Sequence, residues 1–169
     1  MTTEPEIVEL PERPYVAIAA SVTMETIGIV VPPLNQEVFG WLAARGITSA
    51  GPAVWRYNVI DMDRRLEVEA GALVAEPVPG DDRVLAGVLP SGRYATLRHV
   101  GHPSTLMAAT AGLLDWAAAK GLKWDMSPSP EGERWGCRLE VYHTDPAREP
   151  DMTKWVTELA FRLAGGNLR

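Results

Sequence analysis

The sequence predicts an α+β domain in which an antiparallel sheet carries two helices on one face and a ligand groove on the other. Three observations lead to this fold class. Apolar and polar residues alternate with a period of two in several segments, which is typical of strands. Two other segments carry apolar residues at helical spacing between a proline and a glycine. The order strand, helix, strand, strand occurs twice, and two such units side by side give one sheet with both helices on the same face.

The first half of the chain contains the elements of one such unit. They are an extended lead-in over residues 1–13, a strand over 15–24, a helix over 32–45, a turn over 49–52, and strands over 53–60 and 66–76. The lead-in is rich in proline, which disfavours helix. The helix opens with Pro32 and Pro33, because proline suits the first turn of a helix, and Gly46 suits its end.

After a connector over residues 77–83, the second half repeats this order. Its predicted elements are a strand over 84–89, a turn over 90–92, a strand over 93–100, a helix over 103–120, a loop over 123–133, and strands over 134–144 and 154–163. Pro103 again suits the start of the helix, and Gly121 suits its end.

The two halves also resemble each other in sequence. Residues 41–47 read WLAARGI and residues 116–122 read WAAAKGL, so the tryptophan, two alanines and the glycine match. Each segment follows a strand that begins with a tyrosine, Tyr15 in the first half and Tyr94 in the second. We therefore predict a tandem duplication within a single domain over residues 1–169, with its halves at about 14–77 and about 83–164.

The strand over residues 134–144 carries the most informative side chains. Leu139 and Val141 share one parity and are predicted to face a core, whereas Glu140 and Tyr142 stand side by side on the second face. A carboxylate beside an aromatic ring suits a lipophilic cation. The alternative interpretation is a solvated outer face with an amphipathic tyrosine.

The strand over residues 53–60 adds aromatic side chains to this prediction. Trp55, Tyr57 and Val59 share one parity and are predicted on one face of the strand. Trp55 and Tyr57 are expected to enter the groove from the first half, across the pseudo-two-fold axis from Glu140 and Tyr142. The chain has six Trp and four Tyr against two Phe. This excess agrees with the prediction, because pockets and interfaces favour aromatic residues with a polar group.

Composition restricts the cellular setting and the partners. The net charge of −6 makes a nucleic-acid-binding surface unexpected. The chain has no apolar run that is long enough to span a bilayer, and its acidic, proline-rich N-terminus differs from a signal peptide. A single cysteine cannot form an internal disulfide. We therefore expect a cytoplasmic protein that binds neither nucleic acid nor a membrane.

Four segments resemble the GyrI-like small-molecule-binding domain, which also serves as the effector-binding half of some AraC- and MerR-type regulators. They read GRYATLRHVG, LLDWAAAKGL, RLEVYHTDP and KWVTELAF. The resemblance extends over about residues 15–163. It implies the duplicated fold and an aromatic groove for lipophilic, often cationic, planar compounds, with Glu140 at the position of a buried counter-charge. A subgroup resembles hydrolases of strained cyclopropane-containing compounds. The residues outside the domain fit no helix-turn-helix, so the chain resembles the stand-alone form.

Other side chains leave alternatives open. Trp135 and Trp155 either line the rim of the groove or support the core, and Glu69 either faces the groove or belongs to a solvated strand face. His99 and His102 have no cysteine or carboxylate nearby at ligand spacing, so no metal site is predicted. Cys137 has the parity of Leu139, which favours an inert core thiol. No cofactor is predicted.

Three functions agree with these observations. The first is binding of amphiphilic or aromatic, often cationic, small molecules, for sequestration or resistance. The second is a hydrolase in which Glu140 acts as general base on water while Tyr57 or Tyr142 donates a hydrogen bond to the leaving oxygen. The third is a module whose groove takes an aromatic anchor from a protein partner. The natural ligand and the oligomeric state are left open by the sequence.

Overall fold

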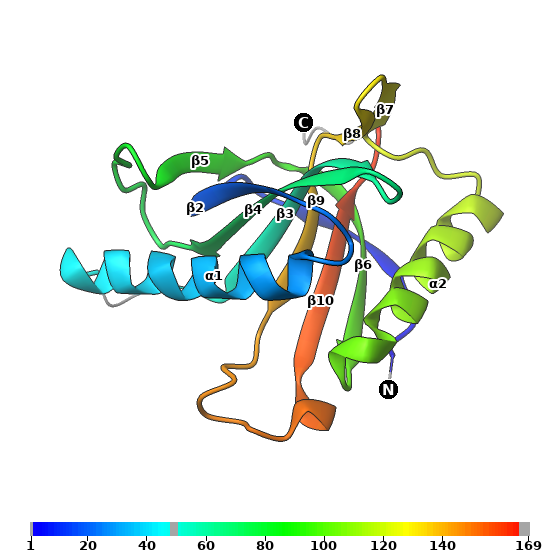
Figure 1. Cartoon of the computed structure of the whole chain (residues 1–169). Coiled ribbons are helices and arrows are strands. Elements are labelled where there is room, and N and C mark those ends of the chain that lie inside the picture. Colours follow the sequence, from blue (N-terminus) through cyan, green and yellow to red (C-terminus); the bar gives the residue numbers. More distant parts are fainter. Residues whose placement is uncertain (1, 48–50, 166–169) are drawn as a thin grey trace.

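The computed structural model describes residues 2–47 and 51–165, and the predicted turn over 49–52 falls partly outside them. Within these residues the chain forms a ten-stranded antiparallel sheet and two α-helices, which confirms the predicted α+β class (Figure 1). The first part contains β1 (Glu6–Leu10), β2 (Arg13–Val22), α1 (Ile27–Ala44), β3 (Ala53–Asp61), β4 (Arg65–Leu73) and β5 (Leu85–Leu89). The second contains β6 (Gly92–Val100), α2 (Leu106–Ala119), β7 (Met126–Ser129), β8 (Gly132–Trp135), β9 (Arg138–Tyr142) and β10 (Val156–Arg162).

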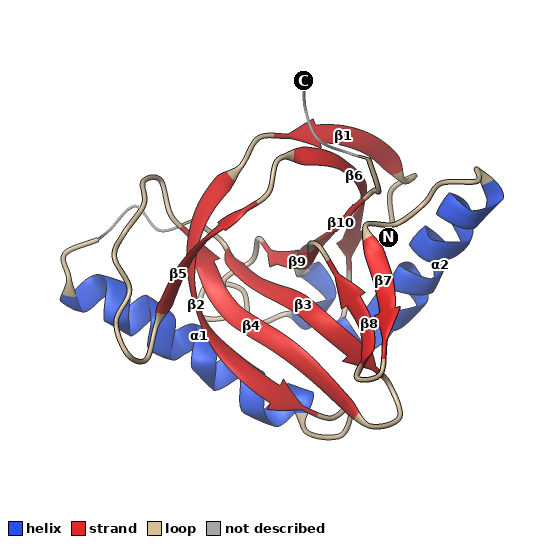
Figure 2. Ribbon diagram, turned by 90° about the horizontal axis from the view of Figure 1, so that it is seen from above, coloured by secondary structure: helices blue, strands red, loops and turns tan. Residues whose placement is uncertain are grey.

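The strand order places β2, β3 and β4 on one side of the sheet and β6, β9 and β10 on the other, whereas β1 lies beside β6 and β5 lies beside β2. The order is β1-β6-β10-β9-β3-β4-β2-β5, and β8 joins β3 and carries β7 beside it. The central contact is therefore between β9 and β3, and the order β6-β10-β9 on one side corresponds to β2-β4-β3 on the other. Figure 2 shows that the sheet curls strongly, with both helices outside the curl.

The two faces of the sheet bury different cores. On the face that we call the helix face, α1 packs against β2 and β4, and α2 packs against β6. Val31 of α1 and Leu113 of α2 belong to the same buried cluster there, together with Val68 and Leu159 of the sheet. The opposite, inner face carries a separate cluster. Its buried residues are Tyr15, Ala17, Val54, Leu89, Tyr94, Cys137, Leu139, Val141 and Ala160.

The first helix begins earlier than predicted. α1 starts at Ile27, so Pro32 and Pro33 lie inside it. Proline has no N–H to bond to the carbonyl four residues earlier. The sequence therefore predicted Pro32 and Pro33 in the first turn, where the helix does not use these N–H groups. The first turn forms nevertheless, because the N–H of Val30 bonds to the carbonyl of Thr26 at 2.9 Å and Val31 is completely buried.

The strand predicted over residues 134–144 is interrupted. β8 ends at Trp135 and β9 begins at Arg138, because the N–H of Gly136 bonds to the carbonyl of Asp125 at 2.8 Å instead of continuing the ladder. Trp135 consequently packs with the helix-face cluster, whereas Cys137 lies in the inner cluster. The predicted loop over 123–133 also holds most of the β7–β8 hairpin.

A bulge in β3 corrects a second parity prediction. The register against β4 pairs Tyr57 with Val68 and then Val59 with Glu67, so one extra residue lies between the two pairs. A bulge turns the following side chains to the other face. Val59 therefore lies on the face opposite Tyr57, although the sequence predicted the same face for both.

Candidate functional site

The central pair of strands brings the predicted aromatic residues to Glu140. In the register of β3 against β9, Trp55 lies directly opposite Glu140, and Ala53 lies opposite Tyr142. Side chains of directly opposed residues share a face of the sheet. Trp55, Tyr57, Glu140 and Tyr142 therefore lie together on one face, and all four are half-buried. We call these four residues the Glu140 cluster.

Hydrogen bonds fix the carboxylate between two tyrosines. The hydroxyl of Tyr57 donates to Oε1 of Glu140 at 3.0 Å, and the hydroxyl of Tyr142 donates to the same oxygen. The rings of Trp55 and Tyr142 meet edge to face, with centroids 5.2 Å apart and an interplanar angle of 64°. The cluster therefore combines one acid with three aromatic rings.

Burial shifts the protonation equilibria of the cluster. Loss of solvent raises the pKa of Glu140, while the hydrogen bonds from Tyr142 and Tyr57 and the charge of Arg138 act in the opposite direction. Burial, followed by the charge of Glu140, raises the pKa of Tyr57 and of Tyr142 well above the ordinary tyrosine value. Both hydroxyls therefore remain protonated donors at neutral pH.

Arg138 is a charged neighbour that the sequence reasoning did not select. It precedes Glu140 by two residues in β9, so both side chains lie on the same face. Its guanidinium carbon lies 4.7 Å from the ring centroid of Trp135 and 4.4 Å from that of Phe161. Burial lowers the pKa of Arg138, although the charge of Glu140 opposes this shift. Its shared parity with Glu140 was the signal that could have identified it.

Asn35 was also missed, and it attaches α1 to the Glu140 cluster. Its side chain is only 8% exposed. Its Oδ1 accepts a hydrogen bond from Nε1 of Trp55 at 2.6 Å, and its Nδ2 lies 3.0 Å from the carbonyl oxygen of Gly71 and 3.3 Å from that of Val54. A polar residue among the apolar residues of the buried helix face was the signal that could have identified Asn35. The sequence alone does not reveal which strands its side chain contacts.

The position of the site on the sheet differs from the prediction. The groove was expected on the face opposite the helices, yet Asn35 of α1 bonds to Trp55, and Trp55 and Tyr57 pack against the helix-face cluster. Parity placed Trp55 with Tyr57 and Glu140 with Tyr142 within each strand, but it could not say which face of the sheet the helices cover. The Glu140 cluster lies over β3 and β9, between the strands under α1 and those under α2 (Figure 1).

The remaining predicted side chains lie apart from Glu140. Glu69 faces the inner side of the sheet, where it accepts hydrogen bonds from the Tyr15 hydroxyl and from Nδ2 of Asn58, the latter at 2.5 Å. Trp135 is 6% exposed and packs in the helix-face cluster. Trp155 is half-buried, and its Nε1 donates to the carbonyl of Glu149 at 2.7 Å.

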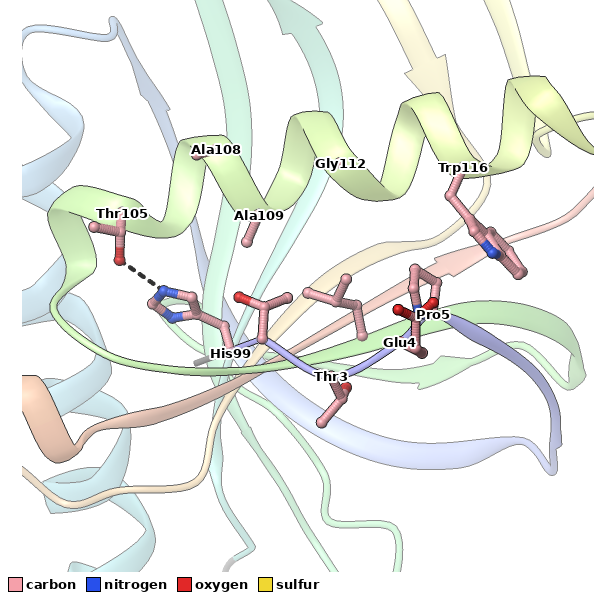
Figure 3. A pocket seen from close by; sticks show the side chains of 11 residues that line it. Thr3, Glu4, Pro5, His99, Thr105, Ala108, Ala109, Gly112 and Trp116 are labelled. Atoms are coloured by element: carbon pink, nitrogen blue, oxygen red, sulfur yellow. Dashed lines mark hydrogen bonds between the residues drawn. The ribbon is translucent and has the colours of Figure 1, made fainter.

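Two hollows in the structure lie away from the Glu140 cluster. One, of about 600 Å³, lies between the N-terminal segment, β6 and α2. Figure 3 shows His99 at one end of it, with Nε2 bonded to Oγ1 of Thr105 at 2.7 Å. The other, of about 490 Å³, lies beside β6 and the N-terminal segment. Neither hollow is lined by any member of the Glu140 cluster.

Within residues 2–47 and 51–165, His, Cys, Asp and Glu side chains form no group of three or more that could hold a metal ion. Neither helix there combines the length and the apolar character that crossing a bilayer requires.

Comparison with known proteins identifies similar folds. The C-terminal domain of EcmrR is similar with a TM-score of 0.70 and 17% identity, over 95% of this chain and 96% of that one. In the complex of EcmrR with DNA the TM-score is 0.70 and the identity 16%, and this chain spans 98% of its own length but only 58% of the EcmrR chain. SAV2435 bound to tetraphenylphosphonium has a TM-score of 0.62 and 11% identity, over 96% and 95% of the two chains.

A hydrolase from Listeria innocua is also similar, with a TM-score of 0.60 and 15% identity over 95% of this chain and 92% of that one. A search of curated proteins found no match. The family model described as the GyrI-like small molecule binding domain matches residues 3–164, nearly the whole sequence. Together with the fold, this match shows that the chain belongs to the family of GyrI-like small molecule binding domains.

Proposed function

We propose that this chain binds amphiphilic, aromatic, cationic small molecules at the Glu140 cluster, with Glu140 as counter-charge and Trp55, Tyr57 and Tyr142 as ring contacts. The observation that carries the proposal is a half-buried carboxylate held by two tyrosine hydroxyls among aromatic rings. Within the described residues, no ion pair of 4 Å or less includes Glu140. Arg138 acts on Glu140 only from a longer distance, so a bound cation would supply the close charge partner that Glu140 lacks.

The energies involved favour a cationic aromatic ligand. A cation over an aromatic ring gains about 0.5–2 kcal/mol, and more as water is removed. A carboxylate in a partly dry site attracts a cation more strongly than it does in bulk water. A flat aromatic body also covers apolar surface. A cationic aromatic ligand gains the ring contact, the attraction to the carboxylate and the apolar burial together. A neutral analogue of the same shape gains only the apolar burial.

The relatives support the same chemical class. SAV2435 was solved with tetraphenylphosphonium, a lipophilic cation, and the EcmrR domain belongs to a protein solved on DNA.

We propose multidrug sequestration or resistance in the cytoplasm as the biological use, and a tandem duplication as the origin of the two halves. A protein partner at the Glu140 cluster is a further proposal, tested by whether an aromatic cation displaces it.

The test is a titration with tetraphenylphosphonium by isothermal calorimetry. Glu140→Gln keeps the shape of the side chain and removes its charge, so we expect binding to weaken by about 1–3 kcal/mol, the scale of a lost charged partner. Glu67→Gln is the matched control, because Glu67 lies in the same sheet opposite Ser21 and outside the Glu140 cluster. Equal affinity of Glu140→Gln and the wild-type protein would reject Glu140 as the counter-charge.

A hydrolase of strained, cyclopropane-type electrophiles is the second candidate. It is favoured by a carboxyl group whose pKa is raised by burial, which suits a general base, and by the Tyr57 hydroxyl 3.0 Å from it, which could serve as the separate donor to the leaving oxygen. If turnover occurs, we expect Tyr57→Phe to reduce the single-turnover rate and Tyr142→Phe to change mainly affinity. Turnover that both variants retain in full would exclude a role for either hydroxyl, and a protein that only binds shows no turnover.

A further inference from the structure

Glu140 has one oxygen that the protein does not use. Oε1 accepts both tyrosine hydroxyls. Across the part of the chain that the structure describes, no hydrogen bond reaches Oε2. A carboxylate accepts up to about four hydrogen bonds. Glu140 can therefore accept a donor from a ligand without losing the contacts that position it.

Arg138 offers the complementary group. Its guanidinium carbon lies near the rings of Trp135 and Phe161 and 6.0 Å from the ring centroid of Tyr57. Among residues 2–47 and 51–165, its guanidinium donates no hydrogen bond to another residue and forms no ion pair of 4 Å or less. Partial burial of this cation is costly, because water no longer solvates it fully. An acceptor on a ligand would relieve this cost.

The two charges lie side by side on one strand. Residues two apart on a strand face are separated by about 6–7 Å along it. Contact with the rings of Trp135 and Phe161 holds the guanidinium of Arg138 in place. The arrangement has no net charge, since a fully ionised Glu140 and Arg138 cancel. A ligand that carries only a cation would meet attraction from Glu140 and repulsion from Arg138.

We infer that Arg138 determines the specificity of this site, so that Glu140 and Arg138 together select dipolar aromatic ligands. Such a ligand carries a cationic group for Glu140 and a carboxylate, or another strong hydrogen-bond acceptor, for Arg138. This inference rests on the proposed function at the Glu140 cluster and narrows its ligand class. A guanidinium is suited to the role because it binds a carboxylate through two parallel hydrogen bonds.

Two dyes with the same ring system provide the test. Rhodamine B has a carboxylate beside a cationic ring system, and its ethyl ester keeps the cation without the carboxylate. Affinities are measured by fluorescence anisotropy for the wild-type protein, Arg138→Met and Glu140→Gln. Methionine retains an apolar side chain against Trp135 and Phe161, and Arg138→Gln is a second variant should Arg138→Met fold poorly by circular dichroism. Arg134→Met is the matched control, because Arg134 is exposed on the neighbouring β8.

The wild-type protein is expected to bind rhodamine B more tightly than the ester. Arg138→Met should weaken rhodamine B by about ten-fold or more, the effect of losing a charged hydrogen-bond partner, and should tighten the ester. Arg134→Met should leave the ratio of the two affinities unchanged. Glu140→Gln should weaken both dyes.

The contradicting results separate the two proposals. If the ratio of the two affinities is the same in Arg138→Met and the wild-type protein, while Glu140→Gln still weakens the ester, the role of Arg138 is rejected and the proposed function stands. If Glu140→Gln leaves the ester unaffected, the counter-charge itself is rejected. Binding of neither dye to the wild-type protein rejects both.

Discussion

At the scale of single residues, the buried carboxylate of Glu140 lowers the free energy of unfolding at neutral pH. Its pKa is raised by burial, so the folded protein holds this proton more tightly than the unfolded chain does. Below the ordinary carboxyl pKa the group is protonated in both states and its favourable contribution is complete. As the pH rises through the folded-state pKa, that contribution is lost because the buried carboxylate must ionise.

Replacing Glu140 by glutamine should therefore stabilise the protein at neutral pH. We expect Glu140→Gln to have a larger free energy of unfolding in urea than the wild-type protein at pH 7, and this advantage should shrink as the pH falls toward the ordinary carboxyl range. A Glu140→Gln variant that is less stable than wild type at pH 7 would mean that the tyrosine hydrogen bonds outweigh the desolvation of the charge.

At the scale of elements, Asn35 connects the first helix to the site. Its three hydrogen bonds reach Trp55, Val54 and Gly71, so one side chain attaches α1 to β3 and β4. Asn35→Ala removes all of them and leaves the indole N–H of Trp55 without this partner. We expect a loss of roughly 2–3 kcal/mol in the free energy of unfolding, since a buried polar group without a partner is costly.

Ligand binding should weaken in the same variant, because the Trp55 ring loses the contact that orients it. The matched control is Gln36→Ala, which removes an exposed amide from the next position of α1 and should change neither property. Both variants can be compared by urea unfolding and by titration with tetraphenylphosphonium. Unchanged stability in Asn35→Ala would show that α1 is held by its apolar residues alone.

At the scale of the whole molecule, the N-terminal strand closes one edge of the sheet. β1 pairs along β6, and Val8 and Leu10 pack against the inner cluster. Deleting residues 2–10 would expose the backbone of β6 and remove this apolar cover. We expect a loss of about 2–4 kcal/mol, from the burial of two apolar side chains, together with concentration-dependent association through the bare edge. Urea unfolding and size-exclusion chromatography measure the two effects, and a stable monomer would contradict them.

The sequence could predict local features of the site but not the long-range ones. Strand parity was sufficient to place Glu140 beside Tyr142 and Trp55 beside Tyr57, because the period of two is a local property of each strand. The opposition of Trp55 and Glu140 and the side of the sheet that α1 covers are long-range pairings. They depend on how the strands are ordered, which no local pattern records. The interruption of the strand at Gly136 could not be predicted either, because it depends on a contact with Asp125, a residue outside the strand.

The measurement that tests the central claim most directly compares two ligands of the same shape and opposite charge. Tetraphenylphosphonium is a cation and tetraphenylborate is an anion, and both present four phenyl rings around a central atom. The account predicts tighter calorimetric binding of tetraphenylphosphonium to the wild-type protein, and a smaller preference in Glu140→Gln, since the charge of Glu140 and the ring faces both attract a cation. Equal or tighter binding of tetraphenylborate would contradict the account.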